Sequence, residues 1–137
     1  NIGIVSLSEN EFFANSGVRS SVEAARDALS NKIQYLTEFL GREYEIQGAY
    51  PAWEYRKDSP LRDKMVSVYE EMYGQKPAVV AIHAGLECGL FLEKFPHLDM
   101  VSFGPTLRGV HAPGEKLDLE SNEKFVKLLV DIVTNFK

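Results

Sequence analysis

The sequence has 137 residues, of which 45% are hydrophobic, which suits a chain that buries the core of about one domain. Its 20 acidic residues outnumber 15 Lys and Arg and give a formal charge of −5, so the composition argues against nucleic acid or an anionic membrane surface as a partner. The single cysteine, Cys88, excludes an intrachain disulfide and a zinc site of several cysteines and favours a cytoplasmic protein. No apolar run is long enough for a membrane span, and the chain opens on residues typical of a strand, so we expect it to be part of a longer protein.

The first fifty residues predict a ββαβ unit. Two short apolar segments within residues 2–18 flank a polar turn, which favours a hairpin. Ser20 and Glu23 form a capping-box pattern ahead of apolar residues spaced by three and four, which predicts a helix. Alternation over residues 44–46 predicts a third strand. One helix over three short strands leaves little area for a core, so we expect this unit to need a partner surface.

A connecting segment over residues 51–59 starts with a proline and carries no sustained periodicity. We therefore expect one domain over residues 1–50 and a second over residues 51–137. Just after the boundary, Ser59 as N-cap and Gly74 as terminator predict a helix, whose apolar stripe should pack on a sheet.

The remaining pattern is typical of a βαβ unit. Residues 78–82 form a continuous apolar run, as in a strand that is buried on both faces, and residues 99–103 are a weaker second case. Helical spacing between them, over residues 86–93, supplies a crossover, so the strands should be parallel and the fold class α/β. Ser121 should open a last helix with one apolar face.

The loop after the second predicted strand contains His111, at the edge where open α/β sheets place their ligands. One ring nitrogen could bind a metal while the other donates to a carbonyl or to a carboxylate such as Glu115. From spacing alone a surface histidine is the better explanation, because no second ligand lies nearby in the sequence.

A second group of candidates lies at the turn before the predicted helix over residues 86–93. Backbone N–H groups there could hold a carboxylate, and Gly85 permits close approach, although the glycine could equally serve the turn alone. Glu87 is better explained as an ordinary first-turn carboxylate, and Cys88 as a small core residue. Arg19, ahead of the first helix, could clamp a substrate carboxylate, but its local pattern favours a surface salt bridge.

Three motifs occur in the order and spacing seen in aminoacyl-histidine dipeptidases, the bacterial peptidase D enzymes. They are HAGLECGLF at residues 83–91, DMVSFGP at 99–105 and HAP at 111–113, and residues 18–21 and 48–53 extend the resemblance to essentially the whole chain. These enzymes belong to a metallopeptidase superfamily that includes relatives of carnosinases, carboxypeptidase G and succinyl-diaminopimelate desuccinylase.

The resemblance implies a metallopeptidase whose α/β catalytic domain is interrupted by a ferredoxin-like lid that also supports dimerisation. Residues 1–50 would then be the C-terminal half of the lid and residues 51–137 the closing segment of the catalytic domain. By the same resemblance, His111 is the last ligand of a two-zinc site, Arg19 is the lid arginine that reaches the substrate, and Gly85 contacts the substrate's carboxylate end. Other divalent metals are possible in place of zinc.

Two departures from the family pattern bear on this expectation. Members often read His-Ser-Pro-Asp-Glu where residues 111–115 read HAPGE, which thins the polar support around the histidine. Members also bring their other metal ligands and the general-base Glu from a segment N-terminal to everything in this chain. We therefore expect no catalytic residue in these 137 residues and no activity from them alone.

The expected function is that of the C-terminal part of a zinc-dependent dipeptidase, a cytoplasmic homodimer that hydrolyses short peptides, Xaa-His dipeptides in particular. Two alternatives remain, namely a non-catalytic dimerisation or binding module, and a sister hydrolase of acylated amino acids on the same scaffold. A longer natural chain with a His-x-Asp pair followed by Glu-Glu favours an enzyme, and a substrate panel separates the two hydrolases.

Overall fold

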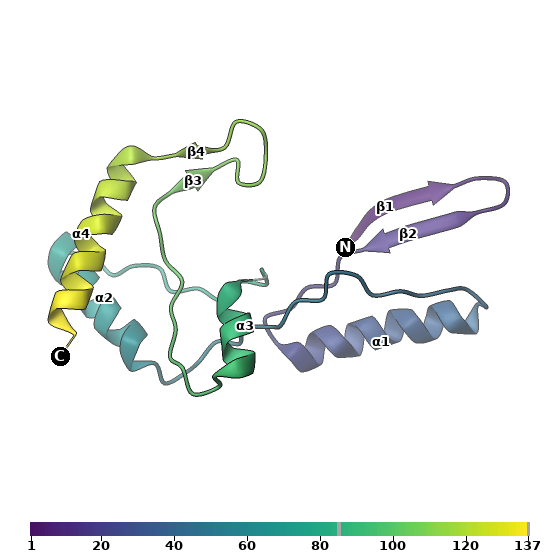
Figure 1. Ribbon diagram of the computed structural model, residues 1–137, viewed down its shortest axis with the longest axis horizontal. Helices are drawn as coiled ribbons and strands as arrows, with labels where there is room; N and C mark the ends of the chain where they lie inside the picture. Colours follow the sequence, from purple (N-terminus) through teal and green to yellow (C-terminus); the bar gives the residue numbers. More distant parts are fainter. Residues whose placement is uncertain (85, 137) are drawn as a thin grey trace. The chain divides into compact units, whose positions relative to one another are not determined.

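The computed structural model describes residues 1–84 and 86–136, which fall into two compact units (Figure 1). The first unit comprises Asn1–Tyr55 and Val80–Pro96, and the second comprises Arg56–Val79 and the residues from His97 on. In chain order the elements are β1 (Ile2–Leu7), β2 (Phe12–Ser16), α1 (Glu23–Phe39), α2 (Pro60–Tyr73), α3 (Glu87–Lys94), β3 (Leu107–Arg108), β4 (Lys116–Leu117) and α4 (Leu119–Asn135). None of the helices in the described ranges is long and apolar enough to cross a membrane.

The predicted hairpin is confirmed at the start of the first unit. Strands β1 and β2 pair antiparallel, with Leu7 opposite Phe12 and an irregularity between Ile2 and Ile4. The Ser8 backbone N–H donates to the Glu11 carbonyl at 2.8 Å and closes the polar turn. The turn chemistry is local, which is why it could be predicted from the sequence.

Helix α1 is confirmed, but its predicted capping box is wrong. The Ser20 hydroxyl accepts from the Val22 N–H at 3.0 Å, which lies ahead of the helix. The first helical N–H, that of Glu23, instead donates to the Glu54 carboxylate at 3.3 Å. A carboxylate from the connecting segment therefore lies at the positive end of the helix, where the helix dipole favours it.

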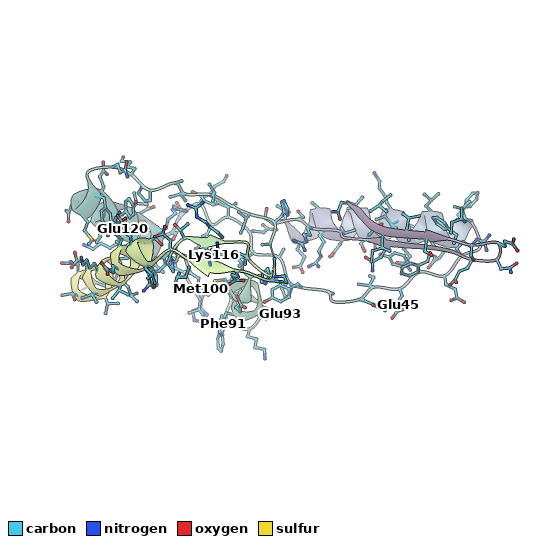
Figure 2. The ribbon with its side chains drawn as sticks, turned by 90° about the horizontal axis from the view of Figure 1, so that it is seen from above. Glu45, Phe91, Glu93, Met100, Lys116 and Glu120 are labelled. Carbon is cyan, nitrogen blue, oxygen red and sulfur yellow. The ribbon has the colours of Figure 1, made fainter. Side chains whose placement is uncertain are left out.

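The predicted third strand over residues 44–46 is also wrong, because this segment pairs with no strand among the described residues. The segment includes Glu45, labelled in Figure 2, and its Tyr44 hydroxyl shares a 2.8 Å hydrogen bond with the Ser30 hydroxyl of α1. An alternating pattern favours extended backbone, but a strand also needs a neighbouring strand to bond with.

Large apolar side chains stay exposed in the part of the first unit that precedes the connecting segment. Helix α1 contains no buried residue, and Ile4 and Leu36 are 59% and 61% exposed. This exposure agrees with the expectation that residues 1–50 need a partner surface.

Helix α2 begins and ends as predicted. The buried Ser59 hydroxyl accepts from the Arg62 N–H at 3.1 Å, and Pro60 occupies the first helical position. Gly74 takes the left-handed conformation with φ of 69° and closes the helix. Both signals depend only on nearby residues.

The core of the second unit lies between α2 and α4, which pack against each other and cross in the view of Figure 1. Its buried hydrophobic residues are Met65 and Val68 of α2 and Leu128 and Ile132 of α4. The expectation that the α2 stripe packs on a sheet is therefore wrong, because the apolar face of α4 covers it. The predicted apolar face of α4 is confirmed, although the helix begins at Leu119 with Asp118 as its cap.

The predicted βαβ unit is wrong in its strands and right in its helix. Helix α3 lies where the crossover was expected, but residues 78–82 and 99–103 pair with no strand among the described residues. Val80, in the first of these segments, is 73% exposed, so no other described element covers this apolar position. The observed strands of the second unit, β3 and β4, form a short antiparallel hairpin that encloses much of the expected loop after residue 103.

Candidate functional site

His111 lies at the tip of the β3–β4 hairpin in an unusual backbone conformation. Its φ is 64°, and among the described residues no other non-glycine residue has a positive φ. Gly109 and Gly114, with φ of 64° and 86°, supply the neighbouring left-handed turns. The Glu115 carboxylate accepts from the His111 backbone N–H at 2.9 Å and holds the turn. A side chain in this region is strained, and such strain is often found at functional sites.

The imidazole of His111 is exposed and makes no hydrogen bond to another described residue. The sequence suggested Glu115 as a partner of the ring, and this is wrong, because Glu115 binds the main chain of His111 instead. Both ring nitrogens are therefore left without a hydrogen-bond partner among the described residues. An imidazole in this state can bind a metal only with ligands and a supporting partner from outside the described residues.

The zinc expected from the resemblance is not accommodated by these residues alone. No group of three or more His, Cys, Asp or Glu within residues 1–84 and 86–136 is placed to hold a metal ion. Protein zinc sites use three or four ligands, and among the described residues none is grouped with His111 to complete such a set. A zinc ion bound through His111 needs its other ligands from outside the described part of the chain.

Arg19 lies in the link between β2 and α1 and is exposed. Its guanidinium forms no ion pair with another described residue, so the surface salt bridge that the local pattern favoured is not seen. An exposed guanidinium with no internal partner can present its planar donors to an external carboxylate.

The turn before α3 is described in part. Gly85, the candidate contact for a carboxylate, lies outside the described residues. Glu87 is exposed in the first turn of α3, as expected for an ordinary carboxylate near a helix N-terminus. His83 and His97 are both exposed.

Tyr50, Glu87 and Cys88 come together where the connecting segment meets α3. Partial burial raises the pKa of the Cys88 thiol, and the nearby Glu87 carboxylate raises it further. Burial also raises the pKa of Tyr50, with smaller contributions from Glu87 and Cys88. Cys88 therefore stays protonated at neutral pH, which agrees with a packing role and argues against a nucleophile.

The structure thus divides the sequence-predicted site residues between its two units. Arg19 and the residues that flank Gly85 belong to the first unit, and His111 belongs to the second. Each unit carries one class of candidate, the substrate-binding residues in the first and the metal ligand in the second.

Asp99 is a polar centre that the sequence analysis missed. Its carboxylate accepts from the Ser59 hydroxyl at 2.7 Å and from the Leu61 N–H at 3.0 Å. Burial opposes its ionisation, but these two hydrogen bonds and the nearby Arg56 and Arg62 charges outweigh burial and lower its pKa. The signal available in the sequence was an acidic residue at the start of an apolar run. In the structure the Asp99 carboxylate helps to cap α2.

Comparison with known proteins shows matches along nearly the whole chain. Residues 2–135 match the family model described as peptidase family M20/M25/M40. The chain is 34% identical over 133 residues to the cytosol non-specific dipeptidase of Escherichia coli (strain K12), covering 97% of this chain and 27% of that protein. A crystal structure of aminoacylhistidine dipeptidase from Vibrio alginolyticus matches with a TM-score of 0.78 and 35% identity, covering 98% of this chain and 27% of that one.

The family match covers far more than half of the chain, and the solved structure supports it at the level of the fold. The chain spans about a quarter of the length of both relatives, since each is covered over 27%. Both relatives are dipeptidases by name. The chain therefore belongs to peptidase family M20/M25/M40, a family of hydrolases.

Proposed function

We propose that this chain is the C-terminal portion of a zinc-dependent dipeptidase that hydrolyses short peptides, Xaa-His dipeptides among them. The observation that carries the proposal is the match of nearly all its residues to one segment of two dipeptidases. The name of the solved relative supports the preference for histidine-containing dipeptides.

In this proposal His111 is one ligand of a site for two zinc ions. Its exposed ring and left-handed backbone support the assignment. A histidine that is only part of the surface has no need of a strained backbone, whereas strained residues are often found at functional sites. The other ligands and the general base come from the part of the longer protein that precedes this chain. Another divalent metal could occupy the same ligands.

Arg19 and Gly85 bind the substrate in this proposal. The exposed guanidinium of Arg19 supports a contact to a carboxylate or carbonyl group of the peptide. Gly85 is assigned to the carboxylate end of the substrate from the motif that it shares with aminoacyl-histidine dipeptidases.

The longer protein is proposed to act in the cytoplasm as a homodimer, with residues 1–50 as half of a ferredoxin-like lid that joins the subunits. The apolar side chains that stay exposed on α1 and on the β1–β2 hairpin support a partner surface there. Sedimentation of the full-length protein tests the dimer, and a monomer at micromolar concentration contradicts it. Nucleic acid and membranes are not among the proposed partners.

The test of the function uses the full-length protein that carries this chain, purified with its metal. We expect hydrolysis of Xaa-His dipeptides, loss of activity with a chelator, and recovery on adding zinc. A panel with other dipeptides and with acylated amino acids distinguishes the sister hydrolase, which cleaves only the acylated compounds. A natural protein no longer than these 137 residues, without hydrolysis of any substrate, makes the chain a binding module and overturns the proposal.

A further inference from the structure

Helix α3 touches the connecting segment at a position where a side chain does not fit. Gly89 is the buried residue of this helix. A Cβ atom built on Gly89 comes within 2.7 Å of the Pro51 carbonyl oxygen and 3.3 Å of the Ala52 carbonyl oxygen. Both obstacles are backbone atoms, so the contact cannot be relieved by turning a side chain.

The connecting segment is held on its other side by α1. The Arg26 guanidinium donates to the Tyr50 carbonyl at 2.6 Å, directly before Pro51. The Glu54 carboxylate accepts from the first N–H of α1 at 3.3 Å. These two bonds attach the segment on both sides of Pro51, so it cannot easily move away to make room at Gly89.

The opposite side of α3 is open. Phe91 lies two residues beyond Gly89, roughly 200° around the helix, and is 53% exposed (Figure 2). Helix α3 therefore contacts the connecting segment through the face that carries Gly89, and the absence of a side chain there sets how closely the two approach. Glycine also weakens a helix relative to alanine, so its presence at this position has a local cost in stability.

The backbone of Gly89 is bonded directly to the turn that precedes α3. Its N–H donates to the Leu86 carbonyl at 2.9 Å, and Leu86 immediately follows Gly85 in the chain. A shift of Gly89 is therefore passed to the residue beside the candidate substrate contact. Glu87 and Cys88, in between, move with it.

We propose that Gly89 is a positioning residue for substrate binding. Because Gly89 lacks a Cβ atom, α3 can pack against the Pro51 carbonyl, and this contact sets the position of Leu86, which follows Gly85 in the chain. The inference rests on the proposed function, in which Gly85 binds the carboxylate end of the peptide.

The test replaces Gly89 in the full-length, metal-loaded protein. The Gly89→Ala variant is compared with Gly3→Ala, whose new Cβ meets the nearest atom, the Asn15 carbonyl oxygen, at an ordinary 3.7 Å. KM and kcat are measured for an Xaa-His dipeptide with a free carboxylate and for the same dipeptide as a C-terminal amide. Melting temperature and zinc content are measured alongside.

For Gly89→Ala we expect KM for the free-acid dipeptide to rise about tenfold, with kcat changed less than about threefold and zinc retained. The preference for free acid over amide should fall by a similar factor, because the lost interaction is with the carboxylate. The Gly3→Ala variant should keep both values. A lower melting temperature with unchanged KM and unchanged preference makes Gly89 a packing residue only and overturns the inference.

A second variant covers the case in which Gly89→Ala does not fold. Pro51→Gly keeps the carbonyl in place but frees the backbone that presses it against α3. We expect KM for the free acid to rise about threefold with kcat unchanged, and no change in KM overturns the inference. If the wild-type protein cleaves no dipeptide, the proposed function itself fails. If the wild type is active and both variants have the same KM as the wild type, only the inference about Gly89 fails.

Discussion

At the scale of single residues, the two described candidates differ in how the backbone presents them. His111 is held in a left-handed conformation by a carboxylate on its own N–H, and Arg19 is an exposed side chain in a link between elements. The first arrangement is specific and costs free energy, on the order of 1 kcal/mol or more, while the second is unconstrained. Their substitutions should therefore have different effects.

The His111→Ala variant of the full-length protein should lose both bound zinc and activity. A neutral imidazole is one of only a few ligands, so its removal should lower zinc content by about one ion and kcat/KM by at least roughly a hundredfold. Elemental analysis and a dipeptide assay measure both. His97→Ala is the matched control, because His97 is also an exposed loop histidine and has no assigned role. Unchanged metal content in His111→Ala contradicts the assignment as a ligand.

The Arg19→Ala variant should lose activity and keep its stability and its zinc. Charge-assisted hydrogen bonds contribute about 1.5–3 kcal/mol, so kcat/KM should fall at least tenfold. Removing an exposed arginine without an ion pair to the described residues should leave the melting temperature nearly unchanged. Arg42→Ala, another exposed arginine of the first unit, is the control. Wild-type kinetics for Arg19→Ala removes this residue from the site.

At the scale of elements, the start of α2 depends on a residue far along the chain. The Asp99 carboxylate accepts hydrogen bonds from the Ser59 hydroxyl and from the Leu61 N–H. The Ser59 hydroxyl in turn accepts from the Arg62 N–H and caps α2. The helix therefore has a local cap and a second, tertiary one. The buried hydroxyl of Ser59 uses both its donor and its acceptor capacity.

The Asp99→Asn variant should destabilise the protein by about 1–2 kcal/mol, because the amide keeps one acceptor and loses the charge. The pKa of Asp99 is lowered in the folded state, so its ionised form stabilises the fold. That contribution is fully present above the unfolded pKa of about 3.9 and is lost as the pH falls through the lower folded pKa. Denaturant melts at pH 7 and at pH 3 should show the wild-type advantage shrinking toward the lower pH. Asp58→Asn, which changes an exposed carboxylate, is the control, and an advantage that is equal at both pH values refutes the role of the charge.

At the scale of the whole molecule, the apolar surface is the main feature. Among the described residues, the buried hydrophobic side chains are those between α2 and α4, while α1 buries none and Val80 is 73% exposed. The chain covers 27% of the length of its relatives, and in the proposed longer protein further residues would cover such surfaces.

The isolated 137-residue chain should therefore show no dipeptidase activity and should expose apolar surface in solution. In the proposed function most metal ligands and the general base lie outside these residues, so the rate of the isolated chain should be lower by many powers of ten. A dipeptide assay with added zinc and a dye that binds exposed apolar surface measure the two properties, with the full-length protein as control. Turnover by the isolated chain at the rate of the full-length protein overturns the expectation.

The sequence by itself determined the elements whose signals are local. The polar turn at Ser8, the cap at Ser59 and the stop at Gly74 involve residues a few positions apart, and the structure confirms them. The periodic apolar positions of α1 to α4 likewise predicted helices because a helix bonds within itself. His111, Arg19 and Gly85 were assigned roles through motif resemblance, since local pattern alone favoured surface roles for His111 and Arg19 and left Gly85 evenly divided between a turn and a ligand contact.

Only the tertiary structure decided the features that depend on distant partners. Residues 44–46, 78–82 and 99–103 have strand-like patterns, but a strand forms only where another backbone lies alongside to accept and donate hydrogen bonds. For the same reason the sequence could not show that Asp99 caps α2 or that Gly89 meets the Pro51 carbonyl. Each of these contacts joins positions about 40 residues apart, where sequence pattern carries no information about proximity.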